Sequence, residues 1–296
     1  MSCTDQKICT AERHGGNNMI YRYKAEDICL KHIFECGQTF RWRPAKSISG
    51  DAGHPEVHEG VCGGYFARVS LVDGVLTVDA TGGDEEFWFN YFDLGRDYGE
   101  VKRVLSEKEP KILKATKQGY GIRILNQDFY EMLISFIISQ NNNIPRIRKC
   151  IEAICEEYGE KIEGTDRYAF PRPEVLAGAD VSRLAELKLG YRCPYIVESS
   201  KRFLEEGVPS GSDTASLKKE LLKYHGVGPK VADCIMLFGL GRVDAFPIDV
   251  WVKRIMNDMY GFELNDLKGM QAFAAEKFGE IGGLAQQYLF YYYREM

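Results

Sequence analysis

The chain of 296 residues is 45% hydrophobic and 27% charged, and its formal net charge is −5. These values are typical of folded globular proteins and exclude a disordered, collagen-like or coiled-coil chain. The longest apolar run, Met132 to Ile138 with Ser135 inside it, is far shorter than the ~18 residues of a membrane-spanning helix. We therefore expect one large or two ordinary domains and no membrane partner.

The N-terminus and the cysteines indicate the compartment. Residues 1–20 contain no apolar stretch typical of a secretory signal. The nine cysteines are an odd number without a Cys-x-x-Cys pair, which favours reduced thiols. We expect an intracellular protein of the cytoplasm or nucleoid, or of the nucleus in a eukaryote. Residues 1–18 are polar, and we expect them to be disordered.

The first part of the chain has the alternation of strands. Asp73-Gly74 is a typical hairpin turn between two of these strands. The segment Ser47 to Gly60 is rich in Gly, Pro and Asp, which predicts a loop. An antiparallel sheet follows from this pattern, with strands at 20–23, 39–42, 65–69 and 75–78.

From about residue 85 the hydrophobic period becomes helical. Phe129, Leu133, Phe136 and Ile137 fall on one face of a helix that reaches Gln140. An aromatic-rich helix is expected near 288–293. The fold class is therefore α+β, a small sheet domain followed by a helical body. Further helices are predicted at 146–158, 174–188, 194–206, 214–224, 230–240, 249–259 and 267–278.

The segment Leu221 to Cys234 predicts a helix, a tight turn and a second helix. Gly226 and Gly228 allow a positive φ and a close approach to a ligand, and Pro229 suits the first position of a helix. The free N–H groups at such a helix start can bind an anion. By itself, the turn is equally compatible with an ordinary connection between helices.

This segment resembles the helix-hairpin-helix element of the DNA glycosylase superfamily. The resemblance implies that Gly226, Gly228 and Lys230 bind a DNA phosphate. Phe246-Pro247-Ile248-Asp249-Val250 resembles the second landmark of the superfamily, with Asp249 19 residues after Lys230. The resemblance also implies a structural monovalent or divalent cation, held by the main-chain carbonyls of Leu222, Tyr224 and Val227.

Lys230 and Asp249 are the candidate catalytic residues. The helix dipole at the start of a helix disfavours the charged form of Lys230, so its amine can act as a nucleophile. Attack on a sugar carbon would displace a base, leave a Schiff base and allow β-elimination. Asp249 is a plausible N-cap, and as a carboxylate it can stabilise oxocarbenium-like charge. Taken singly, a surface lysine and a structural cap are the simpler interpretations. This chemistry needs no cofactor.

Other segments resemble one branch of the superfamily, the 8-oxoguanine DNA glycosylases. No cysteine follows Cys234, so the C-terminal iron–sulfur cluster of other branches is not expected. The resemblance covers about residues 20–296 and implies a TBP-like antiparallel sheet domain at 1–118, a helix-hairpin-helix body at 119–282, and a C-terminal helix at 283–296 that returns to line the base pocket. It is carried by Gly37-Gln38-Thr39-Phe40-Arg41-Trp42, Ser139-Gln140-Asn141-Asn142-Asn143-Ile144-Pro145-Arg146, Gly190-Tyr191-Arg192 and Ala285-Gln286-Gln287-Tyr288-Leu289-Phe290.

The resemblance implies a pocket for a base flipped out of the duplex. Oxidation turns N7 of guanine from an acceptor into an N–H donor, and the main-chain carbonyl of Gly37 would accept from it. Gln286 would read the Watson–Crick edge with its amide. Phe290 and Cys234 would hold the ring between them, and Phe238 would line the same pocket.

A second group would fill the gap left in the duplex. The resemblance assigns Asn141, Arg146 and Arg192 to the estranged cytosine and Tyr191 to a wedge beside it. The sequence departs from the family pattern at Pro145, before Arg146, and at Trp251, where the family can carry a phosphate-contacting histidine.

Three functions follow from these observations. The one we favour is a bifunctional glycosylase and lyase that acts, as a monomer, on double-stranded DNA with 8-oxoguanine opposite cytosine. The alternatives are a monofunctional glycosylase for alkylated bases and a non-catalytic DNA-binding module. Lys230 argues against the first alternative, because an enzyme that activates water needs no amine, and Asp249 argues against the second.

Overall fold

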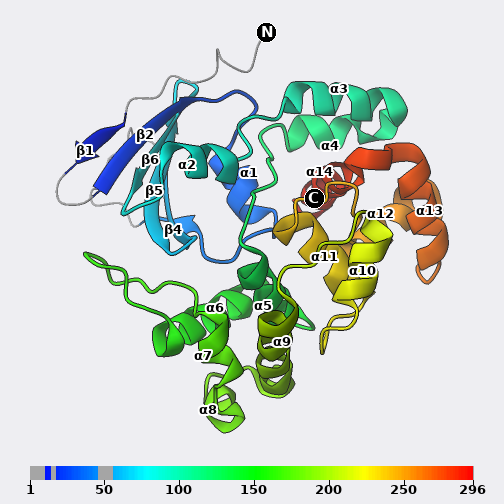
Figure 1. The fold of residues 1–296 in the computed structure, drawn as a ribbon. Helices are drawn as coiled ribbons and strands as arrows, with labels where there is room; N and C mark the ends of the chain where they lie inside the picture. Colours follow the sequence, from blue (N-terminus) through cyan, green and yellow to red (C-terminus); the bar gives the residue numbers. More distant parts are fainter. Residues whose placement is uncertain (1–10, 15–17, 46–55, 296) are drawn as a thin grey trace.

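The computed structural model describes residues 11–14, 18–45 and 56–295. The described strands form one antiparallel sheet of order β1-β2-β6-β5-β4-β3, on one side of the molecule in Figure 1. This confirms the predicted sheet. Its strands are β1 (Glu12–His14), β2 (Asn18–Lys24), β3 (Arg43–Pro44), β4 (Val57–Cys62), β5 (Tyr65–Val72) and β6 (Val75–Ala80).

The β5–β6 hairpin confirms the predicted turn. Val72 pairs with Val75, so Asp73 and Gly74 alone form the loop. Both have a positive φ, of 49° and 74°. A two-residue turn with this geometry matches the right-handed twist of the strands, which is why the Asp-Gly pair is favoured there.

Other predictions for the sheet region were wrong. Residues 39–42 form no strand; Thr39 to Trp42 are buried in irregular structure. The predicted loop ends earlier than expected, since β4 begins at Val57. Of the segment expected to be disordered, residues 1–10 and 15–17 lie outside the described residues, whereas Glu12–His14 pair with β2.

Two short helices, α1 (Leu30–Glu35) and α2 (Glu85–Tyr91), lie between the sheet and the helical body in Figure 1. They complete one hydrophobic core, in which Phe34 stacks on Trp42 at 4.5 Å between ring centroids. The indole of Trp42 also donates a hydrogen bond to the hydroxyl of Tyr91, at 2.7 Å. The sheet therefore packs through aromatic side chains.

The helical body forms a second core around α5, in which every residue from Phe129 to Ile138 is buried. No helix among the described residues is long and apolar enough to cross a membrane. The predicted domain boundaries at 118/119 and 282/283 stay predictions. The helices are α3 (Tyr98–Lys108), α4 (Leu113–Gln118), α5 (Phe129–Ser139), α6 (Ile144–Tyr158), α7 (Pro173–Ala177), α8 (Val181–Glu186), α9 (Cys193–Glu206), α10 (Thr214–Leu221), α11 (Pro229–Gly239), α12 (Val250–Tyr260), α13 (Leu267–Phe278) and α14 (Gly282–Arg294).

The helices confirm the sequence periodicity with one exception. The single helix expected at 174–188 is two helices, α7 and α8, which are separated at Gly178 to Asp180. The Asp180 side chain accepts a hydrogen bond from the N–H of Ser182 and caps α8. A good N-cap inside a periodic stretch thus ends one helix and starts another.

Gln38 joins the sheet domain to the helical body. Its Nε2 donates to the carbonyls of Ile33, at 3.0 Å, and Arg123, at 2.7 Å. Its Oε1 accepts from the N–H of Leu125, at 2.8 Å. The side chain is fully buried, so these bonds offset its loss of hydration. They fix the backbone beside Gly37.

Arg41 makes a second connection between the two parts. Its guanidinium is buried and donates to the carbonyl of Tyr168, at 2.5 Å, and to Glu152, at 3.4 Å. Its Nη1 lies 4.0 Å from Oε2 of Glu131, which is also buried. Burial raises the pKa of Glu131 to about 7, although Arg41 acts in the opposite direction.

This shift predicts how stability depends on pH. A carboxyl in the unfolded chain has a pKa of about 4.3, so the folded protein binds more protons than the unfolded chain between about pH 4 and 7. The free energy of unfolding therefore falls as the pH rises through this range. We expect Glu131→Gln, which cannot ionise, to lose less thermal stability than the wild type between pH 5 and 8, by about 5 °C in Tm.

Thermal unfolding at both pH values measures this difference. Glu163→Gln, at an exposed position, is the control and should behave as the wild type does. An equal loss of Tm in Glu131→Gln and in the wild type would contradict the assignment.

Candidate active site

A cavity of about 50 Å³ lies where the two parts of the molecule meet. It collects residues from α5, α11 and α14, from the turn after α1 and from the segment before α12. Both predicted catalytic residues and all five predicted pocket residues line it. The complete lining is Cys36, Gly37, Phe136, Lys230, Cys234, Phe238, Pro247, Asp249, Gln286, Gln287 and Phe290.

Lys230 and Asp249 both stand at the start of a helix. Gly228 is the N-cap of α11 and Pro229 its first residue, so Lys230 lies in the first turn. Asp249 caps α12, and its Oδ1 accepts from the N–H of Val252 at 2.8 Å. The positive ends of two helix dipoles therefore meet at this cavity.

The turn between α10 and α11 depends on Gly226. Its φ is 81°, and a Cβ built on it would lie 2.4 Å from Cδ2 of Tyr195. The two helices are also joined by an ion pair between Lys218 and Asp233, at 2.6 Å. The predicted helix, turn and helix are thus confirmed.

The charge state of Lys230 differs from our expectation. Its pKa is raised above the ordinary value, because Cys234 and, to a smaller extent, Asp249 favour the ammonium more than burial disfavours it. The helix dipole alone suggested the opposite direction. Burial raises the pKa of the Cys234 thiol to about 11. At neutral pH Lys230 is therefore an ammonium, which must lose a proton before it can act as a nucleophile.

Aromatic rings form much of the cavity wall. Gly37 has a φ of 80°, and the position of its absent Cβ lies 3.5 Å from Cε1 of Phe290. The guanidinium of Arg294 lies 5.7 Å from the centre of the Phe290 ring. Phe136 stacks on Phe238 at 5.5 Å between ring centroids. Gly37 thus brings main chain directly against Phe290.

Gln286 lies in the same wall and contacts its neighbour in the chain. Nε2 of Gln287 donates a hydrogen bond to Oε1 of Gln286, at 2.8 Å. Both side chains are buried, with 4% and 3% of their surface exposed. The amide expected to read a base is thus held by a second amide.

The residues assigned to the opposite base also lie together. The guanidinium of Arg192 donates to the carbonyls of Asn141, at 3.3 Å, and of Gln140, and it lies 4.5 Å from the centre of the Tyr191 ring. Arg192 is buried, whereas half of the Tyr191 surface is exposed. Asn141 has a positive φ of 46°. The turn that follows α5 therefore holds Arg192 in this arrangement.

Arg146 lies near the same group. It is exposed in the first turn of α6, and its Nη2 donates to the carbonyl of Lys188 at 3.3 Å. The N-cap of α6 is Asn143, whose side chain accepts from the N–H of Arg146 at 3.0 Å. Pro145 therefore sits within the first turn, where a missing N–H has no cost.

Four lining residues were not predicted from the sequence. Cys36 and Pro247 adjoin motif residues, and Phe136 belongs to the apolar face of α5, so all three resemble ordinary core positions. Gln287 carried a better signal, because a buried polar residue beside Gln286 needs a partner. Its position on the apolar helix α14 indicated a buried amide.

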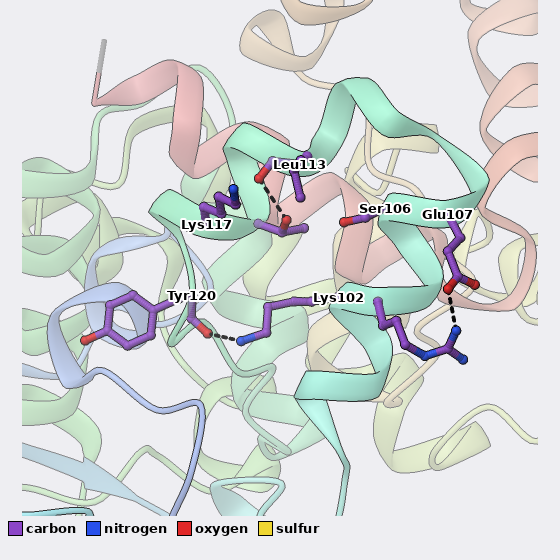
Figure 2. Close-up of a pocket in the computed structure, with 8 residues that line it drawn as sticks. Lys102, Ser106, Glu107, Leu113, Lys117 and Tyr120 are labelled. Carbon is purple, nitrogen blue, oxygen red and sulfur yellow. Dashed lines mark hydrogen bonds and ion pairs between the residues drawn. The ribbon is translucent and has the colours of Figure 1, made fainter.

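A larger cavity, of about 540 Å³, lies between α3 and α4 (Figure 2). Nζ of Lys102 donates to the carbonyl of Tyr120 there, at 3.0 Å, and also pairs with Asp27. None of the predicted site residues lines it. Size therefore does not identify the active site in this protein.

In the part of the chain that the structure describes, no group of three or more His, Cys, Asp or Glu residues could hold a metal ion. A cation at the hairpin would instead depend on main-chain oxygens.

Comparison with protein families agrees with this site. A family model for the N-terminal domain of 8-oxoguanine DNA glycosylase matches residues 20–133, and one for the HhH-GPD superfamily of base excision DNA repair proteins matches residues 134–280. The chain belongs to the 8-oxoguanine DNA glycosylase family. The resemblance seen in the sequence, the α+β fold and the predicted class of enzyme are thereby confirmed.

The matches to individual relatives cover most of the chain. The N-glycosylase/DNA lyase of Saccharomyces cerevisiae is 31% identical over 81% of this chain and 70% of its own. A probable N-glycosylase/DNA lyase of Methanothermobacter thermautotrophicus is 34% identical over 67% of this chain and 71% of its own.

A solved structure covers nearly the whole fold. It is the Clostridium acetobutylicum 8-oxoguanine glycosylase/lyase in complex with double-stranded DNA that contains cytosine opposite 8-oxoguanine. That protein is 38% identical to this one, with a TM-score of 0.87, and the match covers 99% of both chains.

The electrostatics of Lys230 give a test that needs no substrate. Because Cys234 is the first cause of the raised pKa, Cys234→Ala should lower the pKa of Lys230. The ¹³C NMR titration of the reductively methylated protein measures this pKa. Cys62→Ala removes a buried thiol from the sheet core and should leave the titration unchanged. An unshifted Lys230 resonance in Cys234→Ala would contradict the assignment.

Proposed function

We propose that this chain removes 8-oxoguanine opposite cytosine from double-stranded DNA and then cleaves the strand at the resulting site. The observation that carries the proposal is the meeting of Lys230 and Asp249 with Gly37 and Gln286 in one cavity. A nucleophile, a carboxylate and two groups suited to read a purine thus face the same space.

Base release begins at Lys230. After losing a proton, its Nζ forms a bond to C1′ of the flipped nucleotide as the bond from C1′ to N9 breaks, and the electron pair leaves with the base. Positive charge develops on the sugar in this step. The Asp249 carboxylate can stabilise that charge. Opening of the sugar ring then leaves a protonated Schiff base on Lys230.

Strand cleavage follows from the same intermediate. The protonated imine acidifies the C2′ hydrogen, and loss of that proton lets the C3′–O bond break with departure of the 3′ phosphate. Water finally releases the sugar fragment from Lys230. No step requires a cofactor, and the amine explains both activities.

Lesion recognition would use the main chain. Without a side chain at Gly37, a base edge can approach its carbonyl, which accepts from the N7–H of 8-oxoguanine and repels the N7 lone pair of guanine. A cavity of about 50 Å³ holds about two waters, less than a purine needs. The lining must therefore rearrange when the base enters, and we propose that Phe290, which lies against Gly37, moves.

The opposite cytosine would be read by Asn141, Arg146 and Arg192, with Tyr191 as the wedge. Arginine side chains suit the acceptors of cytosine, O2 and N3. Arg192 donates to main-chain carbonyls in the free protein, so it must give up at least one of these bonds. Arg146 is already exposed.

The hairpin would bind a DNA phosphate through Gly226, Gly228 and Lys230. The cation proposed there fits the donors present, because carbonyl oxygens are hard ligands. Within the described residues, the carbonyls of Leu222 and Val227 accept no hydrogen bond, and that of Tyr224 accepts one, from Val227. A bound cation would stabilise the turn that contacts the phosphate.

We further propose that the protein acts as a monomer, since one chain supplies the whole cavity lining. From its DNA substrate we propose that it acts in the cytoplasm or nucleoid, or in the nucleus of a eukaryote.

The first test addresses the nucleophile. With a duplex that contains 8-oxoguanine opposite cytosine, the wild type should release the base, nick the strand and form a covalent complex with borohydride. Lys230→Gln should bind this duplex but lose trapping and nicking by at least 10³-fold, since the attacking amine is gone. Lys201→Gln, an exposed lysine on α9, is the control.

Two outcomes would overturn this assignment. Trapping of Lys230→Gln at the wild-type rate would remove Lys230 from the mechanism. Base release by the wild type without trapping would indicate a monofunctional glycosylase.

The second test addresses Gly37. Alanine there strains a positive φ and moves the carbonyl beside Phe290, so Gly37→Ala should reduce the ratio of affinities for lesion and undamaged duplexes by about tenfold. Gly64→Ala is a matched control, because Gly64 also has a positive φ, of 81°, but lies in the β4–β5 turn. An unchanged ratio in Gly37→Ala, measured by fluorescence anisotropy, would exclude the carbonyl from discrimination.

A further inference from the structure

Gln287 lines the active-site cavity, and the reaction described above gives it no role. It precedes Tyr288 on α14 and is buried, as is Gln286. Consecutive residues of a helix point about 100° apart and do not normally face each other. Here both long side chains reach the cavity, and their amides meet at 2.8 Å.

This contact gives the Gln286 amide a direction. An amide has a donor end, Nε2, and an acceptor end, Oε1. Oε1 of Gln286 accepts from Gln287, whereas Nε2 of Gln286 has no hydrogen-bond partner among the described residues and is not fully enclosed by protein. The donor end of Gln286 is therefore the end available to a ligand in the cavity.

The Gln287 amide makes this one hydrogen bond within the described part of the chain. Its Oε1 is buried and accepts from no donor there. If the Gln286 amide alone turned over, two N–H groups would face each other and the bond would be lost. In this buried site such a loss is costly, since unpaired buried donors are destabilising by about 1–3 kcal/mol.

We propose that Gln287 is a positioning residue that holds the donor end of Gln286 toward the base and thereby selects purines with an oxygen at C6. The inference rests on the proposed function, because it requires a purine in this cavity. N–H of Gln286 would donate to O6 of 8-oxoguanine. In 8-oxoadenine the 6-amino group is itself a donor, so the same N–H would meet a second donor.

This selection differs from that of Gly37. The Gly37 carbonyl distinguishes an oxidised purine from a normal one at N7. The pair of glutamines distinguishes a 6-oxo from a 6-amino purine at the other side of the ring. Sites built to hydrogen-bond one group strongly reject an analogue that leaves their polar atoms unpaired.

Two substitutions distinguish the direction of the Gln286 amide from the mere presence of a long side chain at position 287. Gln287→Met keeps a long side chain but leaves Gln286 free to turn, so the preference for 8-oxoguanine should weaken. Gln287→Glu offers an acceptor in place of the donor, so Gln286 should turn its Nε2 toward the carboxylate and its Oε1 toward the base. The second variant should then favour the 6-amino purine.

The experiment measures single-turnover base release from two duplexes that differ only in 8-oxoguanine or 8-oxoadenine opposite cytosine. We expect the ratio of the two rates to fall at least tenfold in Gln287→Met and further in Gln287→Glu. In Gln287→Glu the ratio should recover as the pH falls, because a protonated carboxyl can donate again. Gln118→Glu, an exposed change of the same kind, should leave the ratio unchanged.

A second readout tests whether each variant folds and retains its nucleophile. Borohydride trapping on a duplex with an abasic site places no base in the pocket, so it should proceed at the wild-type rate in both variants. A variant that traps poorly would be misfolded, and the other variant then decides.

The outcomes distinguish this inference from the function it rests on. A ratio in Gln287→Met equal to that of the wild type, or an equal loss of both bases, would overturn the positioning role. Failure of the wild type to release 8-oxoguanine would refute the proposed function, and the inference with it.

Discussion

The arrangement of the active site depends on the buried carboxamide of Gln38. Its hydrogen bonds reach the end of α1 on one side and the extended segment before α5 on the other. Gln127 adds a bond to the Gln38 carbonyl, at 2.9 Å. A buried amide with all these partners is stabilising, but the loss of any partner leaves a desolvated polar group. Gly37, the preceding residue, is therefore held against α14 by a network that tolerates little displacement.

The chemistry depends on a different constraint, the convergence of segments far apart in the chain. The turn at Gly37, the starts of α11 and α12, and the middle of α14 all reach one small cavity. Each segment is fixed locally, by the Gln38 network, by the N-cap of Asp249, or by the contact of α12 with α14. The catalytic groups thus need no flexible loop to bring them together, which favours the pre-organised electrostatics on which such reactions depend.

Much of the helical body could be predicted from the sequence, because its amphipathic periods are strong. The sheet was harder to predict from the sequence. Strand β4 includes Glu59, whose carboxylate is buried because Arg43 and Arg167 pair with it at 3.0 and 2.9 Å. Such polar residues hide the alternation of a strand, since their partners are distant in the chain. Helix α1 was missed because six residues give little periodic signal.

The site was predicted through its motifs, whereas its electrostatics required the structure. Cys234 lies one helical turn after Lys230, and only the folded geometry shows that their contact favours the ammonium. A free, accessible lysine amine would condense with the sugars and other aldehydes of metabolism. In its ammonium form, and in a cavity with room for about two waters, Lys230 reacts with such aldehydes more slowly than a free amine would. The narrow pocket therefore preserves the reactive amine as well as selecting its target.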